Sequence, residues 1–104
     1  MEEVYRRKVR NTDEFSDKEW VENLINNNPE VVTSFFYEKH KKIFVHHLRK
    51  VFPYQIDVEE YITEFFLHLQ ASDWKRLKTY QSEYSLTTWI SVVSYRFLKI
   101  INYQ

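Results

Sequence analysis

Two groups of ionisable side chains could carry chemistry, and the spacing of each limits what it can do. His40 and His47 stand seven residues apart, about two turns of a helix, so they cannot hold one metal ion together. Glu60, Glu64 and His68 recur every four residues and could form half of a helix-borne metal site, but no matching pair of ligands is evident elsewhere. Ser, His and Asp occur without a nucleophile elbow or a glycine-built oxyanion loop. We therefore expect no enzyme, no metal and no cofactor, and structural roles for the two buried histidines.

A second pattern interleaves bases with aromatic rings just before the last predicted helix. Bases attract phosphates and aromatic rings stack on unpaired nucleobases, so the combination is typical of a surface that binds single-stranded nucleic acid. The alternative is that the rings pack a loop onto the core while the lysines stay in solvent. The segment alone does not decide between them. Its residues are Lys75, Arg76 and Lys78, with Trp74, Leu77, Tyr80 and Tyr84.

Charge is balanced over the whole chain, with 15 Lys and Arg against 15 Asp and Glu, but it is sorted along it. Residues 57–73 carry five acids and no base, whereas residues 74–104 carry five bases and Glu83 as the one acid. Leu67 falls among Glu60, Thr63 and Glu64 on the polar side of its predicted helix. Neighbouring acidic and basic surfaces indicate two different partners. An exposed Leu among acids is typical of a protein contact, and the alternative is a single exposed apolar residue of the kind that is common on protein surfaces.

Length and composition predict a single intracellular domain. The chain has 104 residues, enough for one domain, and its 8 Phe, 8 Tyr and 3 Trp can fill a dense core. It has no Gly and no Cys, which disfavours phosphate-cradling loops, nucleotide-binding α/β folds and disulfide scaffolds. Neither an export signal nor a run of apolar residues long enough to span a membrane is present. We expect a soluble cytoplasmic protein.

Capping residues predict five helices joined by short gaps and no strand. The fold class is therefore all-α, a compact bundle of three to four main helices, with residues 1–16 as an N-terminal segment and 17–104 as the domain. The long helix stops before Pro53, because the residue preceding a proline is pushed out of the helical region. The helices are expected over residues 20–26, 29–51, 58–70, 72–77 and 86–104, with caps at Ser16 or Asp17, Asn28, Asp57, Ser72 or Asp73, and Ser85.

Three of these helices are amphipathic and can close one core. The polar arc of the long helix carries Lys39, Lys42, His46, Arg49 and Lys50. The apolar faces consist of Phe36, Ile43, Phe44, Leu48 and Val51 on the long helix; Val58, Tyr61, Ile62, Phe65, Phe66 and Leu69 on the third; and Leu86, Trp89, Ile90, Val93, Phe97, Ile100 and Ile101 on the last.

Residues 57–69 and 85–96 together resemble the second conserved region of bacterial RNA polymerase sigma factors of the extracytoplasmic-function type. The first stretch, DVEEYITEFFLHL, is similar to the family's capped acidic helix, D-x-x-D-L-x-Q-E-x-F. The second, SLTTWISVVSYR, is similar to a helix that opens S-L-x-T-W-L and follows a basic-aromatic loop. Residues 20–52 look like the preceding helices, so the resemblance covers about 17–104.

The resemblance implies a domain that binds the clamp coiled coil of the largest subunit of core RNA polymerase and helps to melt promoter DNA, part of which is single-stranded. An anti-sigma protein is a further possible class of partner, and no membrane is involved. The clamp-binding residues would be Glu60, Thr63, Glu64 and Leu67. The DNA-binding residues would be Lys75, Arg76, Lys78, Tyr80, Tyr84, Thr88, Tyr95, Arg96 and Lys99.

Three positions depart from the family pattern. Thr63 replaces a Gln, Thr88-Trp89 stands where housekeeping relatives have two adjacent Trp, and Tyr95-Arg96 stands where Arg and then Asn are usual. The second promoter-binding domain of the family does not occur, so the chain is expected to be a fragment. Two other functions remain open: a helical adaptor or anti-sigma-like regulator that binds only protein, and an unrecognised metal enzyme.

Overall fold

In the computed structural model, residues 12–52 and 55–102 are described, and over these ranges the chain is helical without any strand. The predicted all-α class is confirmed. Four helices are long enough to build the core, namely α2, α4, α5 and α7, and shorter pieces join them. The elements are η1 (Thr12–Glu14), α2 (Asp17–Ile25), α3 (Pro29–Thr33), η2 (Ser34–Lys39), α4 (Lys41–Val51), α5 (Val58–Ala71), α6 (Lys75–Lys78) and α7 (Leu86–Asn102).

The predicted caps of four helices are confirmed. Ser16 and Glu19 form a reciprocal capping box at the start of α2, with both hydrogen bonds 3.1 Å long. Asn28 caps α3, and Pro29 occupies its first turn, where the missing N–H costs nothing. Asp57 accepts a hydrogen bond from the Glu60 amide, and Ser85 accepts one from the Thr88 amide. These local hydrogen bonds fix where α2, α3, α5 and α7 begin.

The prediction of one continuous helix from Pro29 to Val51 is wrong. After α3 the backbone widens into the π-helical segment η2, and His40 leaves the helical region before α4 begins at Lys41. The His40 ring turns back onto this segment, with Nδ1 2.9 Å from the Phe35 carbonyl oxygen. A side chain that enters the backbone ladder in this way is a known cause of helix breaks. The wider turn buries both Phe35 and Phe36.

The short helix before the last one also begins later than predicted. Neither Ser72 nor Asp73 caps it, because Asp73 and Trp74 both take the left-handed backbone conformation, with φ of 58°, and α6 starts at Lys75. Asn27, at the end of α2, has the same φ. Its Oδ1 accepts hydrogen bonds from Trp74 Nε1 at 2.8 Å and from Gln70 Nε2 at 2.9 Å. Asn27 therefore links the end of α2 to the α5–α6 junction.

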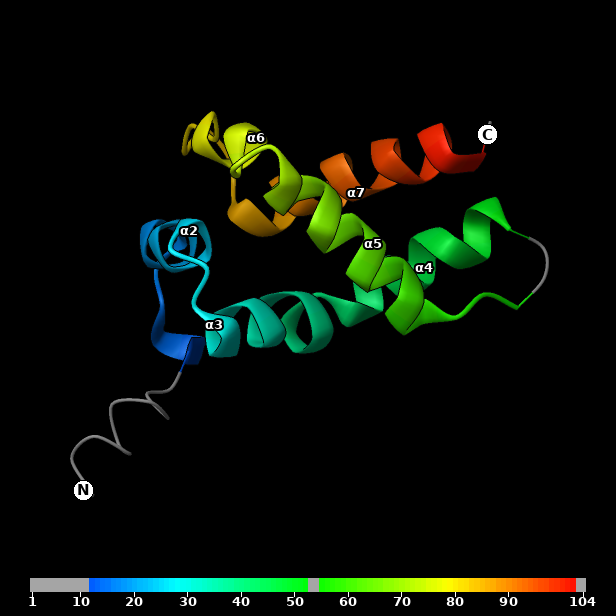
Figure 1. The fold of residues 1–104 in the computed structure, drawn as a ribbon, viewed down its shortest axis with the longest axis horizontal. Helices are drawn as coiled ribbons and strands as arrows, with labels where there is room; N and C mark the ends of the chain where they lie inside the picture. The colour runs from blue at the N-terminus through cyan, green and yellow to red at the C-terminus, as the bar shows by residue number, and fades with distance from the viewer. Residues whose placement is uncertain (1–11, 53–54, 103–104) are drawn as a thin grey trace, which may run out of the picture.

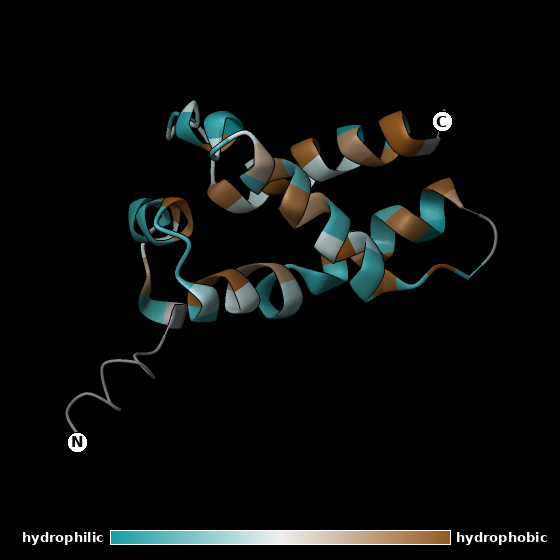
Figure 2. Ribbon diagram, viewed as in Figure 1, coloured by the Kyte–Doolittle hydropathy of each residue, from teal (hydrophilic) through white to brown (hydrophobic). Residues whose placement is uncertain are grey.

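The core is built from the predicted apolar faces, with one correction on α7. The predicted faces of α4 and α5 are buried or half-buried throughout. On α7, Ile100 is 56% exposed, whereas Leu98, which was not predicted to be buried, is fully buried. The reason is that α7 packs against α4, and this orientation places Ser94 and Leu98 in the core. Figure 2 shows apolar residues alternating with polar ones along α4, α5 and α7, and the buried members of these helices form one cluster.

The arrangement leaves one face of α5 open to solvent. α5 crosses the front of the molecule and packs on η2, α4 and α6, while α7 lies behind it against α4 (Figure 1). Of the N-terminal segment, residues 1–11 lie outside the described part; Phe15 packs edge-on against Trp20 with ring centroids 5.1 Å apart. No described helix is both long and apolar enough to cross a lipid bilayer.

Candidate functional site

The exposed face of α5 carries three of the four residues expected to bind polymerase. Glu60 and Glu64 are exposed one turn apart, and Leu67, 48% exposed, follows on the next turn. Because the opposite face of α5 is locked in the core through Tyr61, Ile62 and Phe65, the position of this face is rigid. An exposed apolar side chain that follows two carboxylates along one helix face is suited to contact a basic protein surface.

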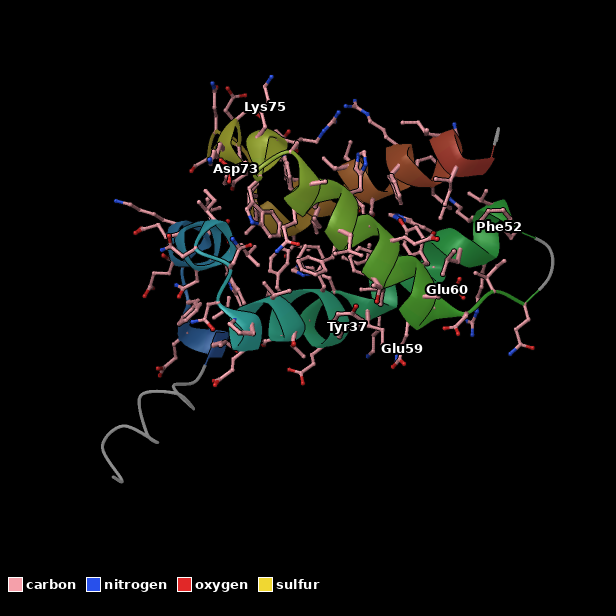
Figure 3. All side chains as sticks on the ribbon, in the orientation of Figure 1. Tyr37, Phe52, Glu59, Glu60, Asp73 and Lys75 are labelled. Carbon is pink, nitrogen blue, oxygen red and sulfur yellow. The ribbon has the colours of Figure 1, made fainter. Side chains whose placement is uncertain are left out.

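Thr63 differs from its three neighbours because it is only partly accessible. Its hydroxyl is hydrogen-bonded to the hydroxyl of Tyr37, which comes from η2 and lies against α5. Figure 3 shows Tyr37, Glu59 and Glu60 near one another on the lower side of the molecule. Thr63 therefore joins η2 to α5. A partner can contact only the part of the Thr63 side chain that Tyr37 does not cover.

A hollow lies beside the acidic face. Its rim carries the carboxylates of Asp57, Glu60 and Glu64, and its apolar lining comes from α4, the chain before α5, and the end of α7. Leu48, Phe52, Ile56 and Ile101 are the apolar side chains that line it. A long aliphatic stem with a cationic end, as in Arg or Lys, matches such a hollow, since the stem can lie on the apolar lining while the charge meets the carboxylates.

The basic-aromatic segment is divided between core and surface. Lys75, Arg76 and Lys78 are all exposed, but Lys78 Nζ lies 3.0 Å from Asp73 Oδ2 in an ion pair. Trp74 is only 1% exposed and Leu77 is buried as well. For these two residues the packing alternative is correct, and Trp74 offers no ring to a nucleobase.

The two tyrosines of this segment differ in accessibility. The Tyr80 ring is half-buried beside Trp89, and its hydroxyl donates to the Tyr84 carbonyl oxygen at 2.6 Å. Burial, and then the nearby carboxylate of Asp17, raise the pKa of Tyr80. Tyr84 is 50% exposed and is the one ring of the segment that stands mostly in solvent. Tyr80 thus holds the loop, and Tyr84 is the residue of the pair that can stack on a base.

Asp17 was considered only as an alternative helix cap, yet it organises the start of α7. Its Oδ2 accepts the backbone N–H of Leu86 at 3.0 Å and lies 3.4 Å from the Tyr80 hydroxyl. Sequence reasoning could not find this role, because 63 or more residues separate Asp17 from both partners. The contact fixes the basic segment against α2.

The expected DNA-binding residues of α7 do not lie on one surface. Thr88 is exposed, and its hydroxyl is 2.9 Å from that of Ser85. Tyr95 is half-buried against His47 of α4, and Lys99 Nζ lies 5.1 Å from the centre of its ring. Arg96 is exposed, but it is rotated from Tyr95 by about 100° around the helix. Tyr95 and Lys99 therefore adjoin α4, whereas Arg96 faces elsewhere.

The two histidines are buried, as predicted, and both bind α7. His40 Nδ1 must carry the proton, since a carbonyl oxygen only accepts, so Nε2 accepts from the Thr87 hydroxyl at 3.0 Å. The Ser94 hydroxyl donates to the Ser91 carbonyl oxygen and accepts from His47 Nδ1 at 3.2 Å. Burial is the main cause that lowers the pKa of both histidines. Both are therefore neutral at pH 7.

Among residues 12–52 and 55–102, no three His, Asp or Glu side chains gather as a metal site would require. His68, considered above with Glu64 as a ligand pair, instead packs its ring against Phe97, with centroids 4.8 Å apart. Comparison of the chain with models of protein families, with curated proteins and with solved structures gives no significant match.

Proposed function

We propose that this chain is a sigma-factor-like domain that binds core RNA polymerase through α5 and promoter DNA through α6 and α7. The observation that carries the proposal is the exposed face formed by Glu60, Glu64 and Leu67, rigidly backed by the core and separate from the bases of α6. The resemblance of residues 57–69 and 85–96 to the second conserved sigma region gives the two surfaces their partners.

The polymerase side of the proposal is a contact between carboxylates and a basic coiled coil. Glu60 and Glu64 pair with cationic side chains, and Leu67 contributes apolar contact at the end of the surface nearer the C-terminus of α5. The hollow rimmed by Asp57, Glu60 and Glu64 can receive one cationic side chain with its aliphatic stem. Such pairs set orientation and association rate more than they set affinity.

On the DNA side the mechanism is binding without catalysis. Lys75 and Arg76 neutralise phosphates, and Tyr84 stacks on an unpaired base. Each stacked base contributes about 1–3 kcal/mol, which is comparable to the cost of separating one base pair. Binding of the unpaired strand in this way favours the melted promoter, provided that polymerase contributes part of the free energy needed to separate the strands.

The test of the polymerase contact is a pull-down of bacterial core polymerase with tagged wild-type chain and two charge-reversal variants. Glu64→Lys should reduce retained polymerase by about tenfold, because it places a cation against the basic partner. Glu22→Lys makes the same change on the exposed side of α2 and should retain as much polymerase as the wild type. Equal retention by both variants would reject the clamp assignment.

A second candidate, a helical adaptor that binds only protein, is favoured by the burial of Trp74 and the half-burial of Tyr80, which leave Tyr84 as the exposed ring of the basic segment. The two functions differ in their response to salt. The sigma-like domain binds a single-stranded oligonucleotide with an affinity that falls as salt rises, and Lys75→Gln/Arg76→Gln weakens that binding. An adaptor would not bind the oligonucleotide, whatever the salt concentration.

A further inference from the structure

The outer side of α4 carries a cationic face that the proposed function does not use. It consists of the charged side chains of Lys42, Arg49 and Lys50 and of the His46 imidazole, which can donate a hydrogen bond, all exposed. The opposite side of α4 is fixed in the core by Phe44, His47 and Leu48, so the four side chains are held outward on a rigid helix.

Among the described residues, neighbouring acids do not neutralise the charges of Lys42, Arg49 and Lys50. Within the described parts of the chain, no carboxylate lies within ion-pair distance of Lys42, Arg49 or Lys50. Lys41, at the edge of the face, lies 3.8 Å from Glu59 of α5, and this pair marks the border with the acidic surface. Glu38 is the one described acid that lines the same open hollow as Lys42, His46 and Arg49. The face therefore carries net positive charge that a partner can neutralise.

The stripe of side chains is long enough to lie along several phosphates of a DNA strand. Lys42, His46 and Arg49 follow one another at intervals of four and three residues and form one stripe. From Lys42 to Arg49 the helix rises about 10 Å, and each strand of duplex DNA presents a phosphate about every 3.4 Å along its axis. The face can thus meet about three consecutive phosphates of one strand.

The surroundings decide the kind of partner. A helix that lies on a membrane needs large apolar side chains beside its charges, and the large exposed apolar residues of the described chain, Leu67, Tyr84, Val92 and Ile100, all lie outside α4. A surface for unpaired bases needs exposed rings, and the exposed positions of α4 include no Phe, Tyr or Trp. Positive charge without either feature fits the sugar-phosphate backbone of a duplex.

We propose that the outer face of α4 binds the phosphate backbone of double-stranded DNA without reading its sequence. The face continues toward α7, where Tyr95 packs on His47 and Lys99 lies over the Tyr95 ring. The interaction requires no polymerase, so it can be present or absent whether or not α5 binds the clamp.

The test measures fluorescence anisotropy of a labelled duplex of arbitrary sequence with the full chain, over a salt series from about 50 to 200 mM. Lys42→Gln/Arg49→Gln removes two phosphate contacts, so its affinity should fall about tenfold at low salt and the slope of log affinity against log salt should flatten by about 2. Lys18→Gln, which removes a charge from an exposed position on α2, should leave both unchanged. Circular dichroism establishes that each variant is folded.

Three results would overturn the proposal. The first is a wild-type chain that binds no duplex at low salt, and the second is a Lys42→Gln/Arg49→Gln variant that binds it with unchanged affinity and slope. The third is a variant that loses binding to polyglutamate or to phosphatidylserine vesicles while its duplex binding is intact, since the face would then serve an acidic protein or a membrane. The polymerase pull-down and the single-strand assay with Lys75→Gln/Arg76→Gln report separately on the proposed function.

Discussion

Ser94 is a small residue with a large structural role. It is completely buried, and three helices meet at it: its hydroxyl accepts from His47 Nδ1 of α4, and its carbonyl oxygen accepts the Tyr61 hydroxyl of α5 at 3.0 Å. Burial raises the pKa of Tyr61, so that hydroxyl remains a donor. Each buried polar group at this point has its hydrogen bond, which is what a polar cluster inside an apolar core requires.

Replacing Ser94 should therefore be far more damaging than replacing its neighbour Ser91. Ser94→Ala leaves His47 Nδ1 without an acceptor, and the free energy of unfolding should fall by about 1–3 kcal/mol. Ser91 is half-buried and its hydroxyl is 3.4 Å from His47 Nε2, so Ser91→Ala should cost less than about 0.5 kcal/mol. Urea denaturation followed by circular dichroism measures both. Equal losses would mean that the Ser94 hydrogen bond contributes nothing specific.

At the scale of elements, the contact between α4 and α7 depends on two neutral histidines. His40 and His47 face Thr87, Ser91 and Ser94, and neither makes a hydrogen bond to a carboxylate that could stabilise a charged ring. The charges near them, in order of effect after burial, are Lys39 and Asp17 for His40, and His46 and Lys50 for His47. Protonation would place positive charge in a buried seam beside other cations.

The stability of the fold should consequently fall in mild acid. Burial lowers the histidine pKa values in the folded chain below the ordinary value of 6.5, so the unfolded chain binds more protons as the pH drops past that value. The part of the free energy of unfolding that depends on the two histidines is constant above about pH 7.5 and decreases below about pH 6.5. The decrease is at most about 1.4 kcal/mol per pH unit for each histidine. Urea denaturation over this range measures it.

His47→Gln and His46→Gln form a matched pair for this measurement. The first removes a buried ring and should flatten the dependence of stability on pH. The second removes an exposed ring from the adjacent position, together with a charge that helps to lower the pKa of His47, and should flatten the dependence far less. If the two variants gave the same pH profile, the acid sensitivity would have to come from other groups.

The elements also indicate how far sequence alone can reach. The caps at Ser16, Asn28, Asp57 and Ser85 were predictable because each uses hydrogen bonds to residues two or three positions away. The break at His40 was not, since its ring is held by Thr87, 47 residues further along the chain.

Backbone conformation set a second limit on what could be predicted from the sequence. Asp73 and Trp74 adopt positive φ in a chain without Gly, and the hydrogen bond from Trp74 to Asn27 helps to hold them there. On α7, the tilt toward α4 buried Leu98 and exposed Ile100, a rotation that the hydrophobic period leaves open. The exposed residues of the candidate site, Glu60, Glu64 and Leu67, follow from helical spacing, while the loss of Trp74 to the core does not.

At the scale of the whole molecule, the exposed carboxylates of Glu60 and Glu64 lie on α5, whereas Lys75 and Arg76 lie beyond its end, where Asp73 pairs with Lys78. Glu59 and Glu60 lie in its first turn, whereas Asp73 and Lys75 lie beyond its last residue (Figure 3). The helix between them is about 21 Å long, so a protein bound at the first end leaves the second free. This separation is what a domain needs if it is to hold polymerase and DNA at the same time, and it is the central claim of the proposed function.

The most direct measurement of that claim is retention of a labelled, randomised single-stranded oligonucleotide on immobilised core polymerase, with and without the chain. The wild-type chain should increase retention of the oligonucleotide. Glu64→Lys should abolish the increase because the chain itself is released from polymerase. Lys75→Gln/Arg76→Gln should also abolish it, but because only the oligonucleotide is released. Glu22→Lys should behave as the wild type. Retention that does not change when the chain is added, or that increases equally with all the variants, would contradict the account.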